Sequence, residues 1–402
     1  MRINKKNLEK LKKKYGNSFY MLDVERFVSN YNEMISSFSK IYKNFGIAYS
    51  YKTNYIPVLC KAVNFLGGYA EIVSDMELEL ALRIGVEYSK IIWNGPIKEE
   101  KCIFGFLENG GIVNADNIDE LKYINQMSKR SKSIFKIGLR CNYDIGDNTI
   151  SRFGFDVNGH DFNKALDIIN SNNKLNLYSM QCHFAKRNIE YWINKVDGML
   201  LTLNRNKLKP SIVDIGGGMY GKMDPYLKKQ FACNIPSYED YANVIARKFY
   251  ANYSKTKNKP KLIVEPGSAL VGDCMEFAGV VKSIKKIQNK FFATVYASQK
   301  NISMSNINPP IKIIAMGKKQ KYYKNVDFVG YTCIENDVIF KDYCGYVANN
   351  DFIIISNCGS YSIVMKPPFI MPNVPVISIS SKKEEIIKQK ESFDDIFAGY
   401  VF

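Results

Sequence analysis

The feature that most constrains the fold is a pattern repeated eight times between residues 44 and 265. Each repeat has a short apolar run, a polar or glycine-rich break and then a helical stretch. The runs are FGIAYS (45–50), YAEIV (69–73), KIIWN (90–94), GGIVNA (110–115), FKIGLR (135–140), LYSMQCHF (177–184), SIVDIG (211–216) and KLIVE (261–265). Apolar strands that alternate with helices are typical of a parallel sheet covered by helices. Eight such units predict an α/β protein with a closed (β/α)8 TIM barrel.

After Gly267 the pattern changes to strand-like runs that are separated by Asn, Gly, Pro or Lys, without long helices. These runs are MEFAGVVKSIKKI, FFATVYA, IKIIAMG, VDFVGYTC, DFIIIS and YSIVMK. They predict a mainly antiparallel β domain. Residues 18–34 contain one strand followed by a helix, and we expect this segment to join the β domain. The predicted domains are therefore residues 1–35 (N-terminal strand and helix), 36–266 (barrel) and 267–402 (C-terminal β domain).

Composition narrows the class of protein and its partners. Lys and Arg total 56 and Asp and Glu total 39, a formal excess of +17. One interpretation of this charge is a surface for an anionic partner such as an acidic carrier protein, a nucleotide-linked substrate or nucleic acid. The other is a basic bias that is spread over the whole surface. We favour the second interpretation, because the basic runs are short and interrupted, and we predict no nucleic-acid partner.

Several features argue against a membrane or secreted protein. No apolar run approaches the roughly 20 residues that span a bilayer, and mean hydropathy is −0.22. The opening MRINKKNLEKLKKKYG is basic and lacks the apolar region of a signal peptide. Nine cysteines without a CxxC pair, and only two histidines, argue against a structural zinc site. We predict a cytoplasmic protein with reduced thiols, no membrane association and no metal.

The active site of a (β/α)8 barrel lies at the C-terminal ends of its strands. The residues found there are Lys52, Glu71, Ser74, Glu77, Asn94, Arg140, His183, Gly216, Gly217, Gly218, Glu265 and Gly267. Singly, each has an ordinary explanation, because a lysine can be solvated, glycines can permit tight packing and Glu-Pro-Gly can form a turn. Their placement at one end of one barrel predicts a catalytic site.

These residue types suit the chemistry of pyridoxal phosphate. A lysine with a depressed pKa, here Lys52, forms a Schiff base with the cofactor aldehyde. A carboxylate such as Glu265 keeps the pyridine nitrogen protonated, so that the ring accepts electrons. Consecutive glycine N–H groups, here in 216–218, bind phosphate. The imidazole of His183 can stack on the ring.

Seven motifs occur in the order found in one known family. They are YSYKTN (49–54), AEIVSDMELELALRIGV (70–86), CHF (182–184), VDIGGG (213–218), VEPGSALV (264–271), VGYTCIENDVI (329–339) and NCGSYSIVMKPPF (357–369). Through them nearly the whole chain resembles the fold-type III pyridoxal-phosphate decarboxylases. That group contains ornithine, arginine and diaminopimelate decarboxylases and has an alanine-racemase-like barrel.

The resemblance implies a role for each matching residue. Lys52 is the Schiff-base residue, His183 stacks on the ring and Glu265 pairs with the pyridine nitrogen. Cys333 protonates the carbanion after CO2 leaves and comes from the neighbouring subunit, which implies a homodimer with shared active sites. The predicted cofactor contacts are Lys52, Glu71, Ser74, Arg140, His183, Gly216, Gly217, Gly218, Glu265, Gly267 and Tyr361. Packing in an apolar strand is the simpler interpretation of Cys333, but the preceding Gly330 and the acidic residues that follow favour function.

The chain departs from the family pattern at three places. Ser268 stands where the family usually has an arginine near the phosphate. Residues 184–187 read Phe-Ala-Lys-Arg where a small-residue loop with a serine is usual, so Lys186 or Arg187 either replaces the missing cation or lies in solvent. Ile334 stands where relatives with dibasic substrates have Asp or Glu. The substrate contacts are predicted at Ile334, Glu335 and Tyr361.

The predicted function is decarboxylation of an amino acid or amino-acid conjugate, which releases CO2 and an amine. The absence of an acidic residue at Ile334 predicts a substrate other than ornithine, free lysine or diaminopimelate. The alternatives are an amino-acid racemase on the same fold, a diaminopimelate decarboxylase and a non-catalytic regulatory homologue. The GGG, EPG and GYTCIEND motifs favour decarboxylation, and retention of Lys52, His183, Glu265 and Cys333 argues against a non-catalytic protein.

Overall fold

The computed structural model describes residues 3–304, 307–317, 319–379 and 384–402. The chain divides into two compact units. The barrel unit comprises Val28–Gly221 and Ile235–Ala269, and the β unit comprises Met1–Phe27, Lys222–Asn234 and Leu270–Phe402. The domain boundaries at residues 35 and 266 stay predictions.

Eight parallel strands form a closed barrel in the first unit. They are β2 (Phe45–Ser50), β3 (Tyr69–Ile72), β4 (Ile91–Trp93), β5 (Ile112–Ala115), β6 (Phe135–Asn142), β8 (Leu175–Gln181), β9 (Ile212–Asp214) and β10 (Lys261–Val264). The strand order is β5-β4-β3-β2-β10-β9-β8-β6, and pairing of β5 with β6 closes the cylinder. Each strand falls on one of the eight predicted apolar runs. The prediction of a (β/α)8 barrel is confirmed.

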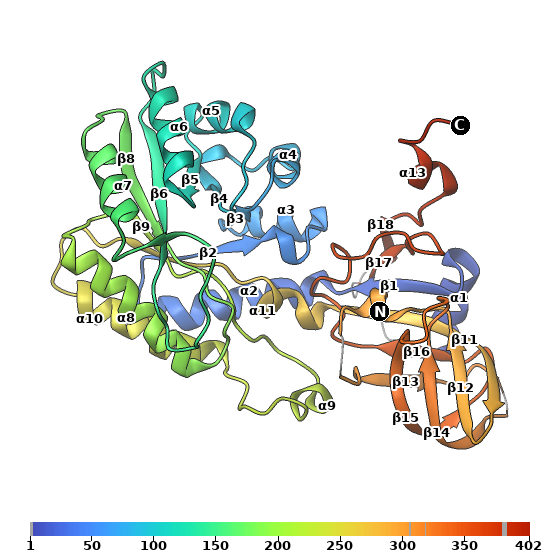
Figure 1. Ribbon diagram of the computed structural model, residues 1–402. Coiled ribbons are helices and arrows are strands. Elements are labelled where there is room, and N and C mark those ends of the chain that lie inside the picture. The colour runs from blue at the N-terminus through green and yellow to red at the C-terminus, as the bar shows by residue number, and fades with distance from the viewer. Residues whose placement is uncertain (1–2, 305–306, 318, 380–383) are drawn as a thin grey trace. The chain divides into compact units, whose positions relative to one another are not determined.

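Helices surround these strands (Figure 1). They are α2 (Val24–Ser39), α3 (Pro57–Phe65), α4 (Asp75–Arg83), α5 (Glu100–Glu108), α6 (Ile118–Ser128), α7 (His160–Asn170), α8 (Ile189–Arg205) and α10 (Tyr238–Tyr253), with the short helices η1 (Tyr51–Thr53), η2 (Tyr88–Lys90) and α11 (Ser268–Val271) and the two-residue strand β7 (Phe155–Asp156). Local sequence sets their starts. Ser74 and Asn117 accept backbone N–H groups at the N-termini of α4 and α6, and Ser237 forms a capping box with Asp240 on α10.

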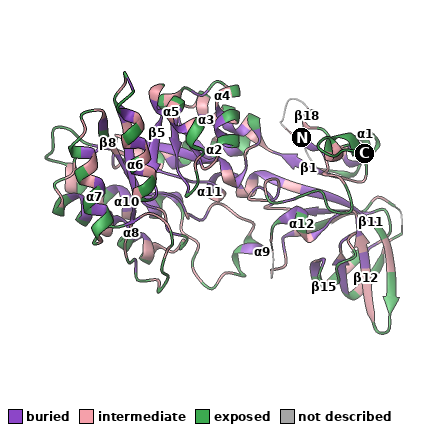
Figure 2. Ribbon diagram, turned by 45° about the horizontal axis from the view of Figure 1, so that its top comes forward, coloured by how far each residue is buried: buried purple, intermediate pink, exposed green. Residues whose placement is uncertain are grey.

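The barrel strands are the most buried part of this unit, and exposed residues lie on the outer faces of the helices (Figure 2). One apolar cluster contains Ala48, Ile92, Ile112, Ile212 and Ile263. Other strand positions carry buried polar side chains, namely Glu71, Asn94, Asn114, Ser179, Gln181 and Asp214. Buried polar groups are costly unless they are paired, so this polar set marks the part of the barrel where chemistry is expected.

The β unit contains a nine-stranded, mostly antiparallel sheet. Its strands are β1 (Ser18–Leu22), β11 (Met275–Ile287), β12 (Lys290–Val295), β13 (Ile311–Ile314), β14 (Lys321–Val329), β15 (Val338–Val347), β16 (Phe352–Ile355), β17 (Val376–Ile379) and β18 (Glu384–Lys388). β1 pairs antiparallel with β11 and parallel with β17, and β12 pairs parallel with β14. The unit also contains α1 (Lys5–Tyr15), α9 (Pro225–Lys228), η3 (Gly272–Cys274), α12 (Gln299–Ile302) and α13 (Phe393–Phe397). The prediction of a mainly antiparallel β domain is confirmed.

One predicted strand of this domain is wrong. The run YSIVMK (361–366) forms a turn, in which Tyr361 has a φ of 62° and its carbonyl accepts the N–H of Met365. A left-handed φ at the first residue of the run is incompatible with an extended strand. Strands β15, β17 and β18 were not predicted. Exposed polar residues interrupt the apolar pattern of β15, and β18 is largely charged, whereas β17 is a short buried run that was missed.

None of the helices in the described residues combines the length and apolar character that crossing a bilayer requires. No group of three or more His, Cys, Asp or Glu side chains among these residues could hold a metal ion. All nine cysteines are free thiols.

Candidate active site

Lys52 lies in η1, directly after β2, and forms an ion pair with Glu71 of the neighbouring strand β3. Its Nζ donates to Oε1 of Glu71 at 2.8 Å and to Oε2 at 2.6 Å. Ser50 Oγ donates to the same carboxylate at 2.6 Å. Glu71 is fully buried, whereas 34% of the Lys52 side chain is exposed. The amine is therefore anchored, while part of the lysine side chain stays exposed.

The predicted depressed pKa of Lys52 is wrong for this structure. Burial lowers the pKa of the amine, but the charges of Glu71 and Glu265 and the hydrogen bonds to Glu71 outweigh it, so the pKa of Lys52 is raised. Burial alone would raise the pKa of Glu71, and the charge and hydrogen bonds of Lys52 instead lower it. The sequence argument considered only the apolar and aromatic neighbours of Lys52 and did not pair it with Glu71.

An amide inside the barrel links this ion pair to Glu265. Asn94 Nδ2 donates to Glu71 Oε1 at 3.1 Å and to Glu265 Oε1 at 2.6 Å. Asn114 Nδ2 donates to Asn94 Oδ1 at 2.8 Å, which fixes the orientation of that amide. Gln181 Nε2 reaches the two oxygens of Glu265 at 3.2 and 3.3 Å. Neutral amides thus contact both of these carboxyl groups.

Three carboxyl groups are buried here, and their electrostatics differ. Burial, reinforced by the charges of Asp214 and Glu71, raises the pKa of Glu265 well above its ordinary value. Burial also raises the pKa of Asp214 to about 7. Burial and the charge of Lys52 hold the pKa of His183 well below its ordinary value. Groups with strongly shifted pKa values, such as Glu265 and His183, are concentrated in catalytic sites.

The triglycine segment after β9 is a tight backbone crossing. Gly216 and Gly218 have φ values of 71° and 85°, which favour glycine. A Cβ at Gly216 would meet the carbonyl of Cys182, and one at Gly217 would meet the carbonyl of Glu265. Side chains at these positions would therefore collide with the backbone beside His183 and Glu265, so only glycine fits there. The amine of Lys52, the carboxyl group of Glu265 and the neutral imidazole of His183 are a set of groups that suits pyridoxal phosphate.

Two of the predicted phosphate donors are already engaged within the barrel. Gly216 N donates to Asp214 Oδ1 at 2.8 Å. Gly217 N donates to Nδ1 of His183 at 3.0 Å. The second bond requires His183 Nδ1 to be unprotonated, in agreement with the lowered pKa, and it orients the ring for stacking.

Other predicted residues occupy the same end of the barrel with structural partners. Gly267 lies against Thr53, next to Lys52, and a Cβ there would collide with the threonine side chain. Ser74 caps α4 by accepting Glu77 N at 3.2 Å. Arg140 is buried at the end of β6, with its Nη1 3.6 Å from Asp116 Oδ1. Whether Ser74 and Arg140 contact a cofactor stays a prediction.

Cys333 lies in the β unit, in the loop between β14 and β15. Residues 333–336 are exposed, and Cys333 is outside the strand. The core-packing explanation of Cys333 is therefore wrong. Buried Asp337 holds the loop, because its Oδ2 accepts Thr332 Oγ1 at 2.6 Å and its Oδ1 accepts Ser298 Oγ at 3.0 Å. Ile334 is 46% exposed on the same loop.

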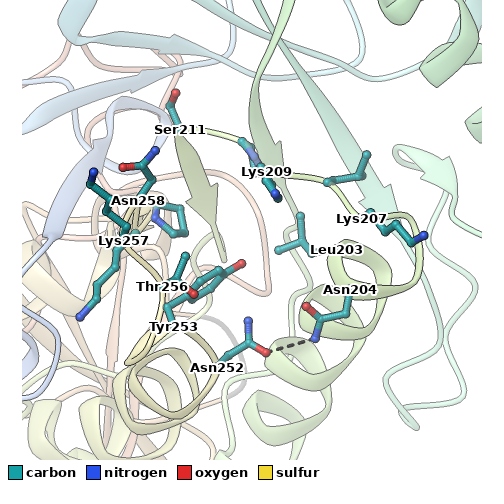
Figure 3. Close-up of a pocket in the computed structure, with 14 residues that line it drawn as sticks. Leu203, Asn204, Lys207, Lys209, Ser211, Asn252, Tyr253, Thr256, Lys257 and Asn258 are labelled. Atoms are coloured by element: carbon teal, nitrogen blue, oxygen red, sulfur yellow. Dashed lines mark hydrogen bonds between the residues drawn. The ribbon is translucent and has the colours of Figure 1, made fainter.

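A pocket of about 870 Å³ lies at the opposite ends of the barrel strands (Figure 3). Its walls are the segments before β9 and β10 and the ends of α8 and α10. Lys207, Lys209, Lys257 and Lys259 line it. Both helices end here with their C-termini, which carry partial negative charge, and basic side chains complement such ends. We assign these lysines to that structural role.

Sequence reasoning missed several residues of the site. Asn94 was noted only as a strand end, and Gln181 and Asp214 were not singled out, because their contacts depend on strand pairing. The sequence did contain a signal for one further residue, Lys195. Lys195 occupies the buried apolar stripe of α8, between Trp192 and Met199, where a lysine is unusual.

Comparisons with known proteins agree with this geometry. Residues 28–272 match the model of the family described as "Pyridoxal-dependent decarboxylase, pyridoxal binding domain". The chain is 27% identical to the diaminopimelate decarboxylase of Methanocaldococcus jannaschii, over 96% of this chain and 92% of the relative. It is 24% identical to the diaminopimelate decarboxylase of Aquifex aeolicus, over 97% and 93%.

Solved structures show the same fold. The crystal structure of the M. jannaschii diaminopimelate decarboxylase has a TM-score of 0.87 and 25% identity, and covers 98% of this chain and 94% of its own. A lysine/ornithine decarboxylase from Vibrio vulnificus, complexed with putrescine, has a TM-score of 0.74 at 16% identity, with 93% and 98% covered.

The predicted cofactor and reaction class are therefore confirmed. The family model covers the barrel with Lys52, His183 and Glu265, and the relatives extend over the β unit as well. The chain belongs to the pyridoxal-dependent decarboxylase family and is a carboxy-lyase of amino acids.

Proposed function

We propose that this protein decarboxylates an amino acid or amino-acid conjugate whose side chain ends in an uncharged or acidic group. The observation that carries this substrate class is the exposed Ile334, next to Cys333. Relatives with dibasic substrates place a carboxylate there. An ammonium moved out of water beside an isoleucine loses its hydration without gaining a partner. A missing charge-assisted hydrogen bond corresponds to about 1.5–3 kcal/mol, or roughly a ten- to hundredfold handicap.

In this proposal the barrel residues hold the cofactor and the reacting amino acid. When bound, pyridoxal phosphate supplies an electron sink for the pair released with CO2. Lys52 Nζ would hold the cofactor aldehyde carbon, and Glu71 would hold the protonated amine through its 2.6 Å hydrogen bond. Glu265, whose orientation is fixed by Asn94 and Gln181, would pair with the pyridine nitrogen. His183 would exclude water from one face of the ring.

Cys333 completes the proposed reaction by donating its thiol proton to the α-carbon after CO2 leaves. Its loop is exposed and is held rigid through Asp337. We further propose that the thiol acts in the site of a second copy, so that a homodimer is the competent unit. A mixture of Lys52→Ala and Cys333→Ala chains then regains up to about a quarter of the wild-type sites. Failure of the mixture to regain any activity would contradict shared sites.

Diaminopimelate is the second candidate substrate. The M. jannaschii and A. aeolicus relatives are diaminopimelate decarboxylases, and this chain matches them over nearly their whole length. The exposed Glu335 follows Ile334 directly and could meet a distal ammonium if the loop shifted by one residue. A cytoplasmic location stays a prediction, and an acidic carrier partner stays the less favoured interpretation of the basic charge.

A competition assay of CO2 release decides between these candidates. Ornithine, lysine and diaminopimelate compete with neutral amino acids, acidic amino acids and amino-acid conjugates. We expect the wild type to prefer the second group and Ile334→Asp to improve use of the dibasic group. Glu335→Gln separates the two candidates, because an unchanged preference supports the first and a selective loss of diaminopimelate turnover supports the second. A wild-type preference for a dibasic substrate that is unaffected by Ile334→Asp would refute the substrate class.

A further inference from the structure

Two segments of the barrel unit lie against each other beside His183. The first, the 184–187 segment, follows His183, and the second is the glycine segment 216–220. A Cβ at Gly218 would lie 2.8 Å from the carbonyl oxygen of Phe184 and 3.5 Å from that of Lys186. The two backbones are therefore in contact, and a displacement of one segment changes the other.

A buried lysine fixes the first segment. Lys195 on α8 is fully buried, and its Nζ donates to the carbonyls of Phe184 at 3.0 Å and Lys186 at 2.6 Å. The amine lies 4.1 Å above the ring of Trp192. Among the described residues its hydrogen bonds go to carbonyls and to no carboxylate, and burial lowers its pKa to about 7. A buried amine without a carboxylate is costly, so packing alone does not account for a lysine here.

Two aromatic side chains form hydrogen bonds to these segments. Trp192 Nε1 donates to the carbonyl of Gly218 at 3.2 Å. The hydroxyl of Tyr241 on α10 donates to the carbonyl of Arg187 at 2.6 Å and accepts the N–H of Tyr220 at 3.0 Å. Trp192 and Tyr241 are fully buried. One hydroxyl group therefore ties the 184–187 segment to the glycine segment.

The two basic residues of the 184–187 segment differ in placement. Arg187 is half-buried, and its guanidinium lies 5.6 Å from the ring centre of Tyr220, within the glycine segment. Lys186 is exposed, and its amine lies 5.7 Å from the ring centre of Tyr191 on α8. Only Arg187 of these two is directed to the glycine segment. An arginine there can bind a phosphate through two parallel hydrogen bonds.

We propose that Arg187 supplies the cation for a phosphate group bound at the glycine segment, where Ser268 leaves none, and that Lys195, Trp192 and Tyr241 are positioning residues for it. They hold the 184–187 segment against the glycine segment through the carbonyls of Phe184, Lys186, Arg187 and Gly218. The inference rests on the proposed cofactor site and adds the residue that recognises the phosphate.

The first test compares pyridoxal 5'-phosphate with pyridoxal, which has the aldehyde but no phosphate. Dissociation constants are measured by absorbance titration. The dissociation constant of pyridoxal divided by that of pyridoxal 5'-phosphate, here called the ratio, isolates the contribution of the phosphate. Arg187→Gln should weaken binding of pyridoxal 5'-phosphate about tenfold or more and leave pyridoxal nearly unchanged. Lys186→Gln is the matched control, with the same charge change on the same segment, and should leave the ratio at its wild-type value.

The second test concerns the positioning residues. Tyr241→Phe keeps the ring and removes the bridging hydroxyl, and Lys195→Met keeps the volume and removes the amine. Each should reduce the ratio selectively, while thermal melting of the cofactor-free protein confirms that the variant is folded. If these residues act through Arg187, each change should have little further effect in an Arg187→Gln background. A full additional effect there would overturn the positioning role.

The outcomes separate this inference from the proposed function. If neither aldehyde binds Lys52 in the wild type, the proposed function itself is wrong. If both bind and Arg187→Gln leaves the ratio unchanged, the inference about Arg187 is overturned while the proposed function stands. If Lys186→Gln lowers the ratio and Arg187→Gln does not, the cation is Lys186 and the assignment is wrong.

Discussion

The ion pair between Lys52 and Glu71 predicts that the carboxylate slows loading of the cofactor. Only an uncharged amine attacks an aldehyde, and Glu71, at 2.6 and 2.8 Å, favours the charged form of Lys52. Glu71→Gln removes the negative charge and keeps the shape of the side chain. At neutral pH, Lys52 in this variant should react with pyridoxal 5'-phosphate faster than in the wild type.

The structure bounds the size of this effect. A charge-assisted hydrogen bond contributes about 1.5–3 kcal/mol, which at about 1.4 kcal/mol per decade raises the uncharged fraction of the amine about 10- to 100-fold. Because 34% of the Lys52 side chain is exposed, water screens part of the interaction. We therefore expect an acceleration near the lower end, about tenfold.

Stopped-flow absorbance of the cofactor-free protein measures the first-order rate at saturating pyridoxal 5'-phosphate, so that differences in affinity drop out. The rate is recorded against pH, and the Glu71→Gln profile should rise at lower pH than that of the wild type. Glu77→Gln is the comparison, because the charge of this buried glutamate also raises the pKa of Lys52 but its carboxylate accepts Val73 N and makes no hydrogen bond to the amine. Its profile should shift less than that of Glu71→Gln. Superimposable profiles for Glu71→Gln and the wild type would refute the reasoning.

Three further predictions concern the same machinery. Lys52→Ala should fold but carry no covalently bound cofactor, and borohydride reduction with peptide mapping that found the label on another lysine would disprove the assignment. Cys333→Ala should lower kcat more than it raises KM and release some aldehyde through misdirected protonation, whereas unchanged turnover with clean amine product would remove its catalytic role. Burial raises the pKa of Asp214 from 3.8 to about 7, so the folded protein retains a proton that the unfolded chain releases, and stability should fall as pH rises from about 4 to about 7. Thermal denaturation of cofactor-free Asp214→Asn should show a flatter pH dependence, and a slope equal to that of the wild type would show that another group titrates.

The barrel could be predicted because its determinants are local. Each strand is a short apolar run with a turn or helix signal on both sides, and strand ends converge in any closed parallel barrel. That geometry placed Lys52, His183 and Glu265 together. The C-terminal sheet was harder to predict, since exposed residues interrupt β15, β18 has no buried residue, and YSIVMK is apolar yet forms a turn at Tyr361.

The contacts within the site could not be predicted from the residues alone. The bridge of Asn94 between Glu71 and Glu265 requires the side-chain positions of three strands at once. The raised pKa of Lys52 follows from that arrangement, which the apolar neighbours of Lys52 did not reveal. Lys195 could have been noticed as a lysine on an apolar stripe, but its carbonyl partners arise only from the fold.

The position of β1 in its sheet has a consequence for the order in which the chain folds. Tyr20 pairs with Phe277 on one side and with Val376 on the other. During synthesis β1 therefore leaves the ribosome long before either neighbour exists, whereas the barrel unit is already complete at Ala269. Pairings between such distant segments form slowly. A nascent chain that stops before β17 would leave one edge of β1 open, and such an edge is a template for aggregation.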